Sequence, residues 1–301
     1  MEALARLNEG CQQHFGLQQP PFTLTPNTRF YVDLPAQRQA YEQVHYALAS
    51  GEGFVKVVGE VGTGKTMLCR RLLNQLQQQE CVTLYLPNPQ LSADGLWLAL
   101  ARELELSVKG RSLATVQQAL QQQLLQHAQQ GRQVVLLVDE AQSMPKATLE
   151  ALRLVSNLET EQQKLLQIVL FGQPELDELL QQPGLRQLQQ RITTTARLSP
   201  LASTEMLADY LQQRLSAAGH RGMQVFSRDA VDYLWQVSGG VPRLVNVLAG
   251  KALLAGYGQG VAQIQRTHVA LAAADTESAR APKRAPLWWS AAVLAACMVM
   301  L

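Results

Sequence analysis

The residues most able to do chemistry lie at positions 59–66, where the sequence reads Gly-Glu-Val-Gly-Thr-Gly-Lys-Thr. This segment matches G-x-x-x-x-G-K-[ST], a pattern in which backbone N–H groups surround phosphate oxygens. In that pattern Lys65 bridges the β- and γ-phosphates and Thr66 binds Mg²⁺. An apolar run precedes the motif and a helical pattern follows it, so the helix N-terminus also faces the phosphates. The predicted nucleotide-binding residues are Gly59, Glu60, Val61, Gly62, Thr63, Gly64, Lys65, Thr66 and Met67.

A second chemical element follows the continuous apolar run 134–138, which is typical of a strand buried on both faces. Asp139 and Glu140 come directly after it, where carboxylates can reach the metal beside the phosphate loop. We expect Asp139 and Thr66 to hold Mg²⁺, and Glu140 to polarise the attacking water. A solvated strand end is the alternative for this pair alone. Together the two motifs predict hydrolysis of a nucleoside triphosphate, and we see no phosphate-acceptor site of the kind that a nucleoside kinase needs.

The elements around these motifs alternate between strand and helix, which predicts an α/β fold with a parallel sheet sandwiched by helices. After residue 200 the strand signals stop and a small all-helical lid domain is expected. The predicted strands are 54–58, 82–86, 134–138, 166–171 and 192–198. The predicted helices are 37–49, 65–79, 96–104, 113–128, 147–158, 175–180, 184–190, 204–217, 228–237, 241–257 and 268–274.

This pattern divides the chain into five parts. Four prolines indicate a loop-rich lead-in without long helices at its start. In the lid, Ser203, Ser227 and Thr267 are predicted N-caps, and Pro242 sits near a first helical position. The expected parts are a lead-in at 1–35, a nucleotide-binding domain at 36–200, the lid at 201–274, a linker at 275–286 and an apolar segment at 287–301.

Composition excludes several classes of protein. The net charge is +2 and no long basic block occurs, so charge does not favour nucleic-acid binding. The four cysteines form no C-x-x-C pair and have no zinc-site spacing, which indicates thiols in a reducing compartment. The first twenty residues have no apolar core of a signal peptide.

The apolar segment 287–301 is the main indication of a membrane. As a helix it would be about 22 Å long, against about 30 Å for a hydrocarbon core. Three possibilities remain open: a short tail anchor, part of a transmembrane helix, or an apolar tail packed on protein. Trp288 and Trp289 beside basic residues favour a membrane interface, with residues 1–286 in the cytoplasm at the inner membrane.

Several segments together resemble AAA+ ATPases, and within them the ExeA/GspA group linked to bacterial secretion and pilus assembly. The chain is similar in type to the MshM-like ATPase of mannose-sensitive pilus systems. The phosphate loop is shared by many NTPases, whereas the combination with 156–159 and 239–246 is much narrower. The segments that carry the resemblance are 14–17, 21–22, 25–30, 59–66, 138–142, 154–160, 170–176, 187–192 and 239–246.

The resemblance implies further catalytic roles and favours ATP as the nucleotide. Gln173 occupies the place of the polar residue that senses the γ-phosphate, although an ordinary polar residue at a loop start is the alternative. Arg243 matches the second sensor, which reaches from the lid to the phosphates, against the alternative of a surface arginine. Asn88 is a weaker candidate for orienting Glu140. Residues that could flank the adenine are Phe22, Phe30 and Tyr31.

The resemblance also implies an arginine supplied to a neighbouring subunit's nucleotide. Arg191 is the first candidate and Arg186 the second, with an ordinary surface arginine as the alternative. If this assignment holds, the active form is a homo-oligomer.

Three functions follow from these expectations. The first is an ATPase that drives or regulates assembly of a cell-envelope machine, such as a type II secretion or pilus apparatus. The second is a DNA-linked AAA+ regulator resembling transposition or initiator ATPases, which ranks lower because no dense basic patch is present. The third is a scaffold that binds ATP with little turnover, against which Glu140 argues.

Overall fold

In the computed structural model the described residues are 2–23, 30–160 and 164–280. They form a five-stranded, wholly parallel sheet in the order β2-β3-β4-β1-β5. The strands are β1 (Phe54–Gly59), β2 (Val82–Leu86), β3 (Val134–Val138), β4 (Gln167–Gly172) and β5 (Ile192–Leu198). The predicted α/β fold with a parallel sheet is therefore confirmed, and every predicted strand is present.

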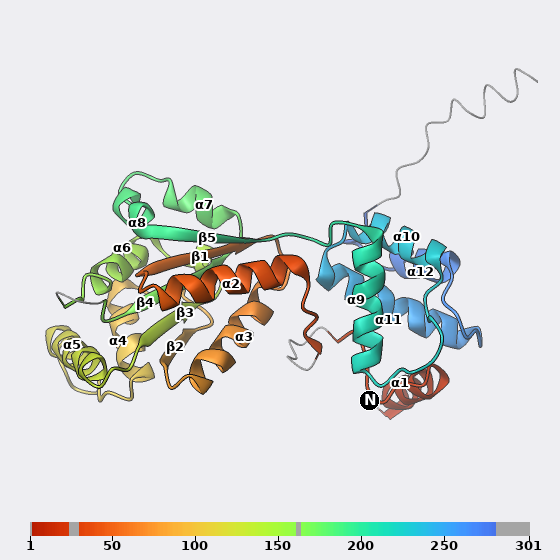
Figure 1. Ribbon diagram of the computed structural model, residues 1–301, viewed down its shortest axis with the longest axis horizontal. Helices are drawn as coiled ribbons and strands as arrows, with labels where there is room; N and C mark the ends of the chain where they lie inside the picture. The colour runs from red at the N-terminus through yellow and green to blue at the C-terminus, as the bar shows by residue number, and fades with distance from the viewer. Residues whose placement is uncertain (1, 24–29, 161–163, 281–301) are drawn as a thin grey trace, which may run out of the picture.

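Helices cover both faces of the sheet, as Figure 1 shows. Side chains alternate along a strand, so Leu136 and Val138 of β3 join the core beneath one helical layer, whereas Val135 and Leu137 join the other. The first layer contains α4 (Ala93–Glu103), α5 (Leu113–Gln129), α6 (Lys146–Val155), α7 (Glu175–Leu180) and α8 (Arg186–Arg191). The second contains α2 (Pro35–Ala49) and α3 (Lys65–Gln78).

A helical lid follows the sheet and has its own core. Its helices are α9 (Thr204–Ala217), α10 (Arg228–Ser238), α11 (Pro242–Gly258) and α12 (Arg266–Ala274). Ser203 and Ser227 cap α9 and α10, as predicted. The predicted cap at Thr267 is wrong, because Gln265 and His268 exchange side-chain and backbone hydrogen bonds and start α12 two residues earlier.

The lead-in differs from its prediction. A 13-residue helix, α1 (Glu2–His14), occupies the stretch in which we expected no long helix. The prolines do not prevent it, because the first of them, Pro20, comes after the helix has ended. Cys11 and Phe15 are buried in the core of the lid. The lead-in therefore packs as part of the lid, although it precedes the sheet in sequence (Figure 1).

Arg214 of α9 ties the second half of the lead-in to the lid. The residue is only 5% exposed, and its guanidinium donates from Nε to Pro21 O (2.8 Å) and from Nη1 to Phe30 O (3.1 Å). The cation also lies over the Phe30 ring, 5.0 Å from its centroid. The chain that enters α2 is thus held by the lid before it reaches the sheet.

Among the described residues, no helix is both long and apolar enough to cross a membrane. The predicted anchor at 287–301 lies outside those residues, as does the second half of the predicted linker.

Candidate nucleotide site

The phosphate loop connects β1 to α3, and its lysine is held inside it. Gly64 adopts a left-handed conformation (φ 100°) immediately before α3 begins at Lys65. Lys65 is buried, and its Nζ donates to Gly59 O (2.7 Å) and Glu60 O (3.1 Å). Burial lowers the pKa of Lys65, while the carboxylates of Glu140 and Asp139 oppose that shift. The loop thus concentrates a desolvated positive charge at the N-terminus of a helix, which suits a phosphate group.

Asp139 faces this loop from the end of β3. Its side chain is buried, and the Thr66 hydroxyl donates a hydrogen bond to it. Burial raises the pKa of Asp139, whereas the hydrogen bond from Thr66 and the charge of Lys65 lower it. A carboxylate beside a hydroxyl supplies the hard oxygen donors that Mg²⁺ prefers. The residues present therefore fit the predicted metal position at Thr66 and Asp139.

Topology explains why Gln173 joins these groups. Strand β4 lies between β3 and β1, so the residue that follows β4 stands between Glu140 and the phosphate loop. Gln173 Nε2 donates to Glu140 Oε2 at 3.1 Å, and the Gln142 amide donates to the same oxygen at 2.6 Å. The predicted catalytic glutamate and the predicted sensor are thus in direct contact.

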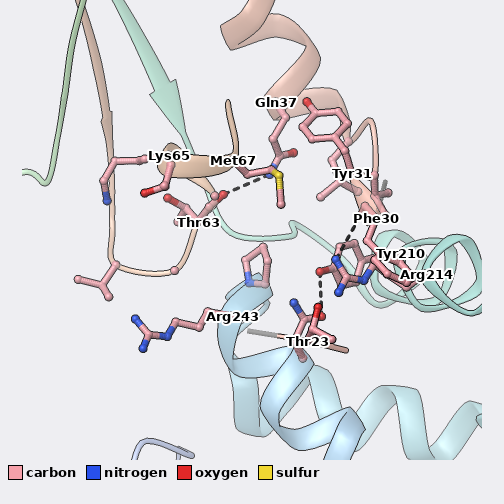
Figure 2. A pocket seen from close by; sticks show the side chains of 18 of the residues that line it. Thr23, Phe30, Tyr31, Gln37, Thr63, Lys65, Met67, Tyr210, Arg214 and Arg243 are labelled. Atoms are coloured by element: carbon pink, nitrogen blue, oxygen red, sulfur yellow. Dashed lines mark hydrogen bonds between the residues drawn. The ribbon is translucent and has the colours of Figure 1, made fainter. Parts of the chain in front are cut away.

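The lid closes the other side of the site through its backbone. The Arg243 N–H donates to Gly62 O (3.1 Å), which joins the first turn of α11 to the phosphate loop. The Arg243 side chain is exposed and lines the pocket at the end where Lys65 also lies, as Figure 2 shows. This position fits the predicted role of Arg243 at the phosphates.

A cavity of about 340 Å³ runs from the phosphate loop to the lid. Phe30 and Tyr31 line its far end, beside Tyr210 and Arg214 (Figure 2). Phe22, the third residue expected near the adenine, is instead packed edge-on against Phe226 in the lid core. The lining residues are Thr23, Phe30, Tyr31, Val32, Leu34, Gln37, Val61, Gly62, Thr63, Gly64, Lys65, Thr66, Met67, Glu140, Gln173, Tyr210, Arg214, Pro242, Arg243 and Asn246.

Arg191, Arg186 and Asn88 are among the predicted residues that do not line this cavity. Arg191 ends α8 and donates from Nη1 to Ser156 Oγ (3.1 Å), and Arg186 is exposed at the start of the same helix. Asn88 accepts from the Gln90 N–H (3.3 Å) within its own turn. The prediction that Asn88 orients Glu140 is therefore corrected, since the amides on that carboxylate are those of Gln142 and Gln173.

Sequence reasoning missed Gln37, Gln142 and Arg214. Gln37 and Arg214 are common polar residues within predicted helices, Gln142 lies in the segment 138–142, and only their contacts give them a function. Gln142 directly follows the Asp-Glu-Ala run, which was its one available signal.

A family model described as an AAA domain matches residues 47–180, the segment from α2 to α7 that contains the phosphate loop, Asp139 and Gln173. The fold also matches Cdc6p from Pyrobaculum aerophilum (TM-score 0.62, 19% identity, 81% of this chain and 67% of that chain). Drosophila ORC bound to DNA gives a TM-score of 0.64 at 19% identity, over 88% of this chain and 65% of that chain. These likenesses establish the fold: the chain is a P-loop NTPase of the AAA+ class.

One relative identifies the group of AAA+ proteins to which the chain belongs. The chain is 40% identical over 269 residues to the General secretion pathway protein A of Aeromonas hydrophila, covering 89% of this chain and 49% of the relative. The chain thus spans about half the length of that protein. The predicted resemblance is confirmed, and the chain is an AAA+ protein of the ExeA/GspA type.

The contact between lid and phosphate loop predicts a large effect of Gly62→Ala on nucleotide binding. Gly62 has φ +84°, and an added Cβ would lie 2.7 Å from Arg243 Cβ. The methyl group must separate the lid from the loop, so we expect nucleotide affinity to fall about tenfold, the loss of one hydrogen-bonded contact. Fluorescent-nucleotide titration measures this change.

Gly110→Ala is the matched control. Gly110 is also left-handed (φ +74°), but its added Cβ would meet nothing within 4 Å. Both substitutions place an L-residue in the left-handed region, which costs about 1–2 kcal/mol in each case. Equal nucleotide affinities of the two variants would show that the contact between Gly62 and the lid does not contribute to nucleotide binding.

Proposed function

We propose that this protein binds ATP with Mg²⁺ and hydrolyses it. The observation that carries the proposal is the convergence of Lys65 of the phosphate loop with Asp139 and Glu140, which follow β3, beside one cavity that the lid closes. Lys65 would neutralise phosphate charge, and Thr66 with Asp139 would hold Mg²⁺. The metal held there would supply positive charge that stabilises the charge developing on the phosphate oxygens.

Glu140 is the proposed base. It lines the cavity, and only its Oε2 atom carries the two glutamine contacts, so Oε1 is available to accept a proton from water. The water oxygen attacks the γ-phosphorus, its proton passes to Oε1, and the bond to the ADP oxygen breaks. Gln173 and Arg243 would contact the γ-phosphate from the sheet and from the lid.

Replacing the base tests hydrolysis separately from binding. We expect Glu140→Gln to lower kcat about 10²- to 10⁴-fold, the usual contribution of a general base, with the Kd for ATP unchanged. Phosphate release and nucleotide titration measure the two quantities. Glu105→Gln is the control, because Glu105 is also a left-handed glutamate (φ 58°) but is exposed at a helix end. An active Glu140→Gln variant would refute the assignment.

A buried glutamine beside the phosphate loop supports adenine as the base. Gln37 is 6% exposed, and its Nε2 donates to Thr63 O (3.3 Å). That contact fixes the amide so that Oε1, a pure acceptor, has no partner although it is buried. A buried acceptor lining the cavity matches an exocyclic amine, which adenine has at C6 and hypoxanthine lacks.

We therefore expect the protein to prefer ATP to inosine triphosphate. Inosine triphosphate carries an oxygen at C6 where ATP carries an amine, so it cannot donate a hydrogen bond to Gln37 Oε1. The loss of that one hydrogen bond should lower affinity about tenfold. Gln37→Met should abolish most of this preference, as measured by competition against a fluorescent nucleotide. Gln39→Met, an exposed change in the same helix, should preserve it. An ATP preference that survives Gln37→Met would rule out this selector.

We also propose that the active form is a homo-oligomer in which Arg191 serves a neighbouring subunit. Arg191 lies outside its own cavity, at the C-terminus of α8, where a helix favours a cation. The nearby Leu154 side chain is 49% exposed, which leaves apolar surface beside Ser156, the hydrogen-bond partner of Arg191. Arg186, exposed on the same short helix, is the second candidate.

Mixing two inactive variants tests the trans arrangement. The Lys65→Ala variant should lose nucleotide binding but still supply Arg191 to a neighbouring subunit. The Arg191→Ala variant should bind ATP, and its kcat should be lower by a factor of about 10² or more. We expect an equimolar mixture to hydrolyse ATP faster than the sum of the two samples. Lys65→Ala mixed with Lys65→Ala/Arg191→Ala is the control. Simple additivity would mean that Arg191 does not act across subunits.

The cellular role that we propose is nucleotide-driven assembly of an envelope machine. It is supported by the similarity to the General secretion pathway protein A and by the apolar sequence at 287–301. ATP binding would tighten the contact between the lid and the phosphate loop and change the surface offered to an envelope partner. The proposed location is the cytoplasmic face of the inner membrane, with pilus biogenesis as one possible system.

A further inference from the structure

Three side chains at the edge of the sheet form a closed set of hydrogen bonds. Gln142 Nε2 donates to Glu140 Oε2 (2.6 Å), and Gln173 Nε2 donates to the same atom (3.1 Å). The third bond runs from the Gln173 backbone N–H to Gln142 Oε1 (3.1 Å). One glutamine therefore holds both the proposed base and the segment that carries the proposed sensor.

The orientation of the Gln142 amide is determined by its two partners. A backbone N–H can only donate, so it requires the oxygen of the amide. An ionised carboxylate can only accept, so it requires the nitrogen. Gln142 meets both requirements at once, whereas a flipped amide would meet neither. Gln142 both donates to Glu140 and accepts from the Gln173 N–H, so a side chain that only donates or only accepts cannot replace it.

The local backbone explains why such a tether is needed. The ladder between β3 and β4 ends at the pair Val138–Leu170, and the two strands have no backbone pairing beyond it. Glu140 is left-handed (φ 52°, ψ 40°), a conformation that a non-glycine residue adopts only when its surroundings hold it. The short helix η2 (Ala141–Ser143) carries Gln142, which reaches Glu140 after β3 and Gln173 after β4. The amide continues the connection between the strands after the ladder stops.

We propose that Gln142 is a positioning residue for hydrolysis, which fixes the Glu140 carboxylate and ties it to Gln173. Gln142 is absent from the cavity lining, so it acts through these two residues. By occupying Oε2, it determines that Oε1 is the oxygen left for water. When Gln173 turns its amide to a phosphate oxygen, Gln142 remains to hold the carboxylate. The inference rests on the proposed function, because it assigns a part in that reaction.

The test uses the full chain and three substitutions. Gln142→Met keeps the length of the side chain and removes both bonds, whereas Gln142→Glu keeps the acceptor for the Gln173 N–H and loses the donor to Glu140. We expect each to lower kcat about 10- to 100-fold, as small misplacements of a reacting group do, with the Kd for ATP unchanged. Gln263→Met, which removes a side-chain bond to Gln224 O in the lid, should leave both quantities unchanged.

A double-mutant cycle with Gln173→Met separates positioning from a general structural effect. Gln142 also holds the Gln173 backbone, so its loss already displaces Gln173, and the double variant should be less impaired than the product of the two single effects. The proposal would be overturned if the two effects simply multiplied in the double variant. It would also be overturned if the Gln142 variants had an unchanged kcat, or if they lost affinity for ATP and kept kcat. If the wild type itself fails to hydrolyse ATP, the proposed function fails instead, and ATP binding by the same samples distinguishes the two cases.

Discussion

The structure depends on a parallel sheet that is buried on both faces. Strands such as β3 and β4 are fully buried along their length, so they have no room for charged side chains. Polar chemistry is therefore confined to the ends of the strands, and parallel strands bring their carboxyl ends to one edge. Gly59, Asp139 and Gln173 all lie at that edge. The position of the site therefore follows from the burial of both faces of the sheet by helices.

The lid adds the second half of the site through a few specific contacts. The backbone bond between Arg243 and Gly62 and the guanidinium of Arg214 act at opposite ends of the cavity. Arg214 is also buried without a hydrogen-bond partner for its Nη2 atom, which is costly in the absence of a ligand. The lead-in packs on the lid and then continues into α2, so the lid is connected to the sheet both before α2 and after β5. Any movement of the lid therefore acts on both of these connections.

Polar groups with unmatched or shared hydrogen bonds mark the functional parts of the cavity. Gln37 offers a buried acceptor with no partner, and Glu140 accepts two amides on one oxygen. A buried acceptor without a partner, such as Gln37 Oε1, reduces stability unless a ligand supplies the missing donor. Gln37 contacts Thr63 of the phosphate loop, and Glu140 contacts Gln173 at the end of β4.

The sequence by itself determined the local parts of this protein. The phosphate loop, the Asp139–Glu140 pair and the bounds of strands such as 82–86 and 134–138 follow from short patterns of glycine, charge and apolar residues. Only the tertiary structure decided that α1 belongs to the lid, that Phe22 is a core residue, and that Gln142 meets Glu140 and Gln173. Those outcomes depend on contacts between residues that are distant in sequence or on the orientation of a single amide. Propensity and periodicity describe neighbouring residues, so they carry no information about such contacts.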